Sequence, residues 1–270
     1  MRVQAGITVF VLLLAAAVNA QTIDIRQGTP ALRVLGSNGM KAVINELRPR
    51  LEKELGRPLT ITFDTSTAVR QHIEAGDAFD VAVLTAEVIN DLAKSGKIDR
   101  RSVVELGRAG IGFGVRDGAP KPDVKTPEAV KQTMLNAKSL TWVAAGASRE
   151  HIDKMIEALG IASAMKSKIV LTNGVDESND LVAQGKNDMV VTLISEIKPA
   201  KGVQYVGPLP DQFQSYVTFA AGVSPKSTLP AAGALFIKQL TLPQAGKVYI
   251  AKGMEGPAGG NLRGRQSVPK

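Results

Sequence analysis

Short apolar runs alternate with segments of helical period along the first part of the chain. Residues 32–35 form an apolar run, a polar corner follows at 36–38, and apolar residues then recur at spacings of three and four. This stripe consists of Met40, Val43, Ile44, Leu47, Leu51 and Leu55. Run, polar corner and helical stripe recur from residue 59 and again from residue 81. Such alternation of strand and helix is typical of a parallel α/β sheet.

A second series of the same kind follows. Apolar runs predict strands at 111–115, 140–143, 169–171, 189–191 and, after a break at 207–210, 216–221. Helices are predicted from Pro127, through 152–159, from Leu229 and from Pro243. Two βα series predict two lobes that face each other, and ligands of open α/β sheets bind beyond the carboxyl ends of the strands. The pattern therefore predicts a protein with a ligand cleft between its lobes.

Composition narrows the class of protein. The 270 residues are 44% hydrophobic and 21% charged, as in an ordinary globular protein of one large domain or two lobes. The net charge of +8 favours anionic partners weakly, but scattered basic residues and 4% aromatic residues argue against nucleic acid. There is no cysteine, and the two histidines are far apart, so we expect no metal site and no cofactor.

The two ends of the chain differ from the body. Residues 1–20 carry one cation at Arg2, an apolar run at 7–18 and small residues at 18–20, which is the pattern of a cleaved secretory signal peptide. A membrane anchor is the alternative, but the apolar run is shorter than the roughly 20 residues that span a bilayer. Residues 256–270 are rich in Gly and Pro and predict a flexible tail.

The corners after the predicted strands carry short motifs in a characteristic order. They read GSNG at 36–39, TST at 65–67, IEAG at 73–76, GIG at 110–112, GAPKP at 118–122, AGAS at 145–148, ISEI at 194–197, VGPLP at 206–210, QSY at 214–216 and KGM at 252–254. This ordered set resembles the periplasmic solute-binding proteins of ABC importers, and among them the molybdate-binding protein family.

The resemblance implies a fold and a role. The fold is the two-lobed type 2 periplasmic binding fold, α/β, with a mainly parallel sheet flanked by helices in each lobe. Lobe 1 would comprise 21–110 and 222–255, and lobe 2 would comprise 111–221, with hinge crossings near 110–118 and 214–222. The implied protein is periplasmic, monomeric and not an enzyme, and it delivers a small anion to an ABC permease in the inner membrane.

The candidate ligand site combines the resemblance with the polar corners. The resemblance carries ligand positions onto Ser37, Ser66, Ala145, Gly146, Ala147, Val175 and Thr192. Neighbouring corner residues extend this set by Asn38, Thr67, Ser148, Arg149 and Ser195. Unpaired N–H groups at helix starts favour anions, although Ser and Thr are also common helix caps. We expect Ser66 both to cap its helix and to bind the ligand.

The ligand and the role stay open between stated alternatives. Members of the molybdate-binding family usually have tyrosine where Thr192 stands and proline where Ala144 stands, so the anion is either a tetrahedral oxyanion or a small carboxylate. Arg149 would hold a carboxylate with its planar fork or lie on the surface. His151 is expected on a polar wall or at the surface, and the lone Trp142 is expected in the core.

Two other roles use the same kind of fold. One is a ligand-binding subunit of a periplasmic sensor, which needs only a closing cleft and a docking face. The other is a secreted hydrolase, for which the chain lacks a G-x-S-x-G elbow, an H-E-x-x-H motif and a P-loop. The sequence therefore favours binding over catalysis.

Overall fold

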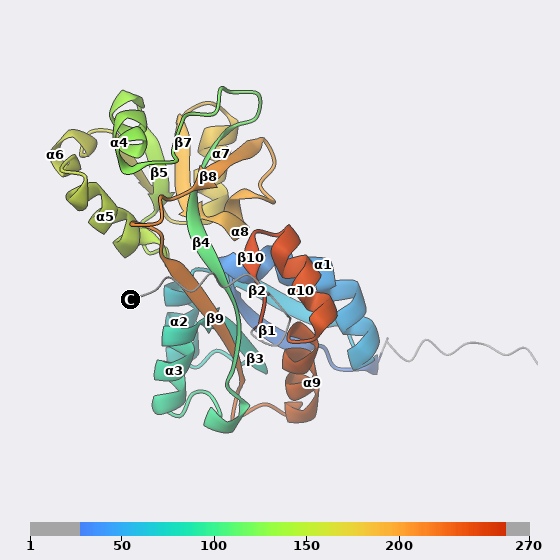
Figure 1. Cartoon of the computed structure of the whole chain (residues 1–270). Coiled ribbons are helices and arrows are strands. Elements are labelled where there is room, and N and C mark those ends of the chain that lie inside the picture. The colour runs from blue at the N-terminus through green and yellow to red at the C-terminus, as the bar shows by residue number, and fades with distance from the viewer. Residues whose placement is uncertain (1–27, 258–270) are drawn as a thin grey trace, which may run out of the picture.

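The computed structural model describes residues 28–257. The predicted signal peptide, 1–20, and all but the first two residues of the predicted tail, 256–270, lie outside the described residues. Within the described part, the strands form one continuous sheet in the order β2-β1-β3-β9-β4-β7-β5-β6, with β8 and β10 both paired to β4. Figure 1 shows that this sheet is divided between two lobes, and that the long strand β4 runs from one to the other.

The first lobe contains β1, β2 and β3 as parallel neighbours, with β9 antiparallel to β3. Its strands are β1 (Leu32–Ser37), β2 (Leu59–Asp64), β3 (Val81–Thr85), β9 (Tyr216–Val223), β10 (Met254–Glu255) and the first half of β4 (Val104–Arg116). Its helices are α1 (Asn38–Leu55), α2 (Ser66–Ala75), α3 (Ala86–Lys94), α9 (Pro230–Leu240) and α10 (Pro243–Ala251), with a 3-10 turn, η2 (Arg100–Ser102).

The second lobe repeats the plan around β5, which pairs in parallel with β6 and β7. Its strands are β5 (Leu140–Val143), β6 (Ile169–Thr172), β7 (Met189–Leu193), β8 (Val203–Pro208) and the second half of β4. Its helices are α4 (Pro127–Asn136), α5 (Arg149–Ala158), α6 (Ala162–Met165), α7 (Val175–Ala183) and α8 (Ile194–Ile197). The two-lobed α/β fold and its parallel strands confirm the predicted fold class, although antiparallel strands complete each sheet.

The lobes meet where β4 changes partners. Its residues up to Gly110 pair with β9, and those from Ile111 pair with β7 and β8. The second connection between the lobes precedes β9, where the Gln214 side chain accepts from the Ile111 N–H at 2.9 Å and donates to the Ile111 carbonyl at 3.0 Å. Residues 216–221, which the sequence assigned to lobe 2, pair instead with strands of the first lobe.

Two strands differ from the sequence expectation. β4 spans 13 residues and not only 111–115, because its first half pairs with β9. β8 covers the region where Gly and Pro interrupt the apolar pattern. It pairs with β4 through a register shift, and a Cβ on Gly112 would lie 2.8 Å from the Gly207 carbonyl oxygen. Close approach of these backbones explains glycine there.

The apolar stripes lie in the core as their spacing predicts. Five of the six stripe residues of α1 are fully buried, and Leu55 packs against the same core. Trp142 on β5 has no exposed surface, which confirms it as a core residue. Burial of apolar area at about 25 cal/mol per Å² holds each helix against its sheet and positions the corners where the helices begin.

Candidate functional site: two pockets at the lobe boundary

Two cavities have linings drawn from both lobes. The larger, which we call the cleft pocket, has a volume of about 1080 Å³ and lies between the starts of α2 and α3 on one side and the corner before α5 on the other. The smaller, which we call the side pocket, has a volume of about 440 Å³ and lies between α1, α7 and α8. Both volumes suit a small-molecule ligand.

The first-lobe corner of the cleft pocket is formed by Thr65, Ser66 and Thr67. Thr65 is the N-cap of α2, and its Oγ1 accepts from the Ala68 N–H at 3.1 Å. The expectation that Ser66 caps this helix is therefore wrong, because the helix begins at Ser66 itself, one residue earlier than that role requires. The Ser66 hydroxyl instead accepts from the Thr85 N–H at 3.0 Å and joins the α2 corner to the α3 corner.

The second-lobe corner spans residues 144–148. The Ala144 N–H donates to the Thr172 carbonyl at 2.9 Å, and the Gly146 N–H donates to the Val143 carbonyl at 3.2 Å. A Cβ on Gly146 would lie 3.0 Å from the Val143 Cβ, so the turn favours glycine. Ser148 stands at the N-cap of α5 but makes no side-chain cap bond.

The two corners leave backbone donors free. Among residues 28–257, no hydrogen-bond partner takes the N–H groups of Ser66, Thr67, Ala145, Ala147 or Ser148. Free N–H groups and the positive ends of helix dipoles attract anions without a cationic side chain. An anion in the cleft pocket would meet donors from both lobes.

Charged side chains surround these donors. Arg149 Nε donates to Asp153 at 2.6 Å, and its two terminal nitrogens have no partner within the described residues. Lys154 pairs with Glu150 on the same helix, and the His151 Nε2 lies 3.3 Å from the Ser215 hydroxyl. Arg149 is therefore a cleft cation with donors still available for a carboxylate, whereas Arg70, the other arginine of the lining, pairs with both Glu74 and Asp91.

The predicted site residues are divided among three places. The cleft pocket brings together Ser66, Thr67, Ala145, Gly146, Ala147 and Arg149. The side pocket contains Asn38, Val175 and Ser195. The remaining three, Ser37, Ser148 and Thr192, line neither pocket and are buried.

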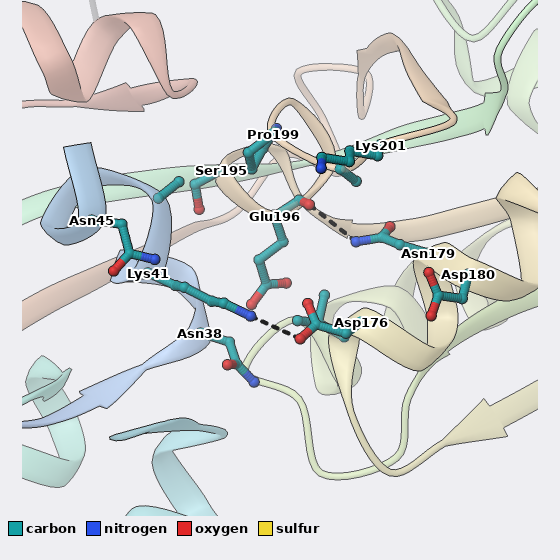
Figure 2. A pocket seen from close by; sticks show the side chains of 13 residues that line it. Asn38, Lys41, Asn45, Asp176, Asn179, Asp180, Ser195, Glu196, Pro199 and Lys201 are labelled. Atoms are coloured by element: carbon teal, nitrogen blue, oxygen red, sulfur yellow. Dashed lines mark hydrogen bonds and ion pairs between the residues drawn. The ribbon is translucent and has the colours of Figure 1, made fainter. Parts of the chain in front are cut away.

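Thr192 has a partner that the sequence analysis did not single out. Its hydroxyl donates to Glu196 Oε2 at 2.5 Å, one helical turn later. Burial raises the pKa of Glu196 to about 7, against the opposing effect of the Thr192 hydrogen bond. Glu196 lines the side pocket, and Figure 2 shows its carboxyl group pointing toward Lys41 and Asp176.

The side pocket also contains an ion pair between the lobes. Lys41 of α1 donates to Asp176 of α7 at 2.8 Å (Figure 2). The sequence offered no signal for this pair, because 135 residues separate its members. Exposed pairs of this kind contribute at most about 1 kcal/mol.

The described part of the chain contains no cluster of three or more histidine, cysteine or acidic residues arranged to hold a metal ion. In residues 28–257, no helix combines the length and apolar character needed to cross a bilayer. The observations therefore define a two-lobed protein whose cleft offers hydrogen-bond donors to a small ligand.

This chain belongs to the family of bacterial extracellular solute-binding proteins, whose model matches residues 32–255. It is 28% identical over 237 residues to an aconitate isomerase of a Pseudomonas species, covering 85% of this chain and 89% of that protein. The solved structures share the fold at lower identity. The periplasmic molybdate-binding protein of Azotobacter vinelandii has a TM-score of 0.69 at 16% identity, with 88% of this chain and 100% of that chain covered.

The sulfate-binding protein SubI from Mycobacterium tuberculosis H37Rv has a TM-score of 0.66 at 18% identity, with 85% of this chain and 88% of that chain covered. Together with the family, these structures confirm the resemblance to molybdate-binding-like solute-binding proteins. The general role of the family is the capture of a solute outside the cytoplasmic membrane.

Proposed function

We propose that this protein is an exported solute-binding protein that captures a small carboxylate in the cleft pocket and delivers it to an ABC importer. The observation that carries this proposal is the set of four residues with free backbone N–H groups that line one cavity from two facing corners, namely Ser66, Thr67, Ala145 and Ala147. The carboxylate would lie between them, so both lobes would contact it.

A carboxylate is favoured over an oxyanion by two further observations. Arg149 lines the same cavity with two free terminal nitrogens, and a guanidinium fork matches the two oxygens of a carboxylate. The relative that acts on aconitate, a compound with three carboxylates, aligns over most of the chain. Molybdate and sulfate binders share only the fold with this protein.

The proposed hinge lies at the two connections between the lobes. Ligand that contacts both corners favours the closed arrangement by its differential affinity for the two forms. We expect the lobes to rotate about the junction of Ile111 and Gln214, because the two connections are hydrogen-bonded to each other there. We assign export to residues 1–20 and the permease contact to the exposed faces of the lobes.

The test is a thermal-shift screen with aconitate, citrate and succinate against molybdate, tungstate and sulfate. A ligand at 100 times its Kd stabilises the folded protein by about 2.7 kcal/mol, which raises the melting temperature visibly. We expect a carboxylate to give the largest shift. Stabilisation by the oxyanions alone would replace the carboxylate with an oxyanion, and stabilisation by neutral sugars alone would contradict the anion site.

An isomerase is the second candidate, and the 28% identity to an aconitate isomerase is the observation that favours it. Isomerisation needs a base near the bound ligand, and the imidazole of His151, the side chain most often used as a general base, lines the cleft pocket. Proton NMR of aconitate incubated with the protein would follow the ratio of its isomers. A stable ratio with saturable binding supports transport, whereas a changing ratio that is lost in His151→Ala supports catalysis.

A further inference from the structure

The side pocket contains buried polar atoms without partners. Ser195 is 1% exposed and Asn179 is 6% exposed, and both line this pocket. The Ser195 hydroxyl and the Asn179 Oδ1 have no hydrogen-bond partner within the described residues. Buried polar atoms without partners are rare and costly. Two of them in one cavity indicate a ligand that supplies the missing bonds.

The hydrogen bond of the Asn179 amide nitrogen indicates which group the ligand must provide to the amide oxygen. The Asn179 Nδ2 donates to the backbone carbonyl of Glu196 at 3.1 Å (Figure 2), so Oδ1 is left as the acceptor of this amide group. The Glu196 carboxyl accepts from the Thr192 hydroxyl and from the backbone of Leu193, which are both uncharged donors. Asn179 Oδ1 is therefore an acceptor that the described residues leave unsatisfied, and a ligand with an N–H or O–H donor would satisfy it.

The charges of the lining favour a cation. Lys41 is already paired with Asp176, and the other lysine in the lining, Lys201, is matched in number by Asp180. Glu196 is the remaining charge, and no cation pairs with its carboxyl group within the described residues. A monocation would compensate it, as buried carboxylates require.

We propose that the side pocket binds a small primary ammonium compound, whose N–H groups bond to Glu196 and Asn179 while the Ser195 hydroxyl contacts its polar substituent. This site is distinct from the carboxylate site in the cleft pocket. Because α1 belongs to one lobe and α7 and α8 to the other, an occupant holds both lobes and favours their closed arrangement. The ammonium compound therefore acts as an effector of carboxylate binding.

The experiment uses ethanolamine as the probe and choline as its matched control. Choline carries the same hydroxyl group and the same charge, but its three N-methyl groups remove every N–H donor. Nitrogen–proton NMR titrations of the purified protein at pH 8 would follow the amide resonances of α7 and α8. We expect saturable shifts with ethanolamine and none with choline.

Three variants locate the binding site. Glu196→Gln keeps the shape of the side chain and should weaken ethanolamine binding about 10- to 150-fold, as expected for a lost hydrogen bond to a charged group. Ser195→Ala should weaken it about 2- to 10-fold. Ser163→Ala changes an exposed serine of α6 and should leave it unchanged. Affinity in the parent protein should rise as pH increases through 7, and Glu196→Gln should abolish this rise.

The charged groups that face Glu196 are Lys41 on α1, Asp176 and Asp180 on α7, and Lys201 after α8. Absence of saturable shifts with ethanolamine, equal shifts with choline, or shifts that survive in both site variants would each overturn the proposal. These outcomes are independent of the thermal-shift screen, in which a carboxylate can succeed or fail whatever ethanolamine does.

Discussion

The cleft pocket and the side pocket both lie between the lobes, but they present opposite chemistry. In the cleft pocket, the donors are backbone N–H groups, and two of the residues that supply them are Ala145 and Ala147. In the side pocket, the unsatisfied atoms are side-chain oxygens of Asn179 and Ser195, and Glu196 lines the same pocket. We therefore propose that one lobe boundary has sites for ligands of opposite charge.

The two pockets differ in how amino-acid substitutions should change their ligand preference. Backbone donors persist when side chains are replaced, provided that the corner keeps its conformation, so we expect the cleft pocket to prefer anions through its fold. Selection among anions then depends on the few side chains that reach the cavity, of which Arg149 is the clearest. The side pocket owes its preference to side chains, and single substitutions should remove it.

The largest expected effect is a dependence of folding stability on pH that comes from Glu196 in the side pocket. Because burial raises the pKa of Glu196 from its ordinary value of 4.5 to about 7, the folded protein holds this proton more tightly than the unfolded chain does. This contribution to stability is complete below pH 4.5 and is lost as pH rises through 7. The loss amounts to at most about 3 kcal/mol. Urea unfolding at pH 5 and pH 8 measures it.

Glu196→Gln should remove this part of the difference between the two pH values. Glu54→Gln, at an exposed position of α1, provides the matched control and should leave the difference unchanged. An unchanged difference in Glu196→Gln would show that another group carries the pH dependence. In that event, the charge assigned to the side pocket would be wrong.

The cleft corners could be predicted from sequence because each follows a predicted strand directly. Ser66 and Ala145 lie after β2 and β5, and the carboxyl ends of these strands face the same cavity. The helix cap was harder to predict, since Thr65 and Ser66 are adjacent hydroxyl residues. Their roles depend on which of them begins the helical hydrogen-bond pattern, and a shift of one residue exchanges those roles.

The side pocket could not be predicted as a site. Its charged and polar residues come from three helices, and Lys41 lies 135 residues from its partner Asp176. The spacing of Thr192 and Glu196 was the only local signal, but that spacing alone does not distinguish a buried pair from a surface pair. Likewise, β8 was missed because Gly207 and Pro208 interrupt a strand that pairing with β4 stabilises.

The next effect tests whether a side chain or the backbone selects the ligand of the cleft pocket. Arg149→Ala should weaken binding of the best carboxylate in the screen by about 10- to 150-fold, because a charged hydrogen-bond partner is lost. Lys154→Ala provides a control on the same helix, where the lysine is paired with Glu150 and more exposed than Arg149. Its effect should stay below about threefold. Calorimetric titration compares the two variants.

Asp153→Asn refines the same test, since Asp153 holds Arg149 Nε at 2.6 Å. Binding of a sulfate or molybdate ion in Arg149→Ala with undiminished affinity, together with loss of carboxylate binding, would show that the backbone donors bind anions and Arg149 selects among them. Equal affinity of Arg149→Ala and the parent for the carboxylate would place the guanidinium outside the site.

The smallest effect concerns the first-lobe corner, where the hydroxyl groups have different tasks. Ser66→Ala removes the acceptor of the Thr85 N–H and should cost about 1 kcal/mol of stability, with little loss of carboxylate affinity. Thr65→Ala removes the helix cap and should cost about 0.5 to 2 kcal/mol. Thr67→Ala removes a hydroxyl group without a partner in the described residues, so it should leave stability unchanged and weaken carboxylate binding about 2- to 10-fold. Urea unfolding and calorimetric titration of the three variants separate these tasks. A large loss of affinity in Ser66→Ala without a loss of stability would show that its hydroxyl turns from Thr85 to the ligand.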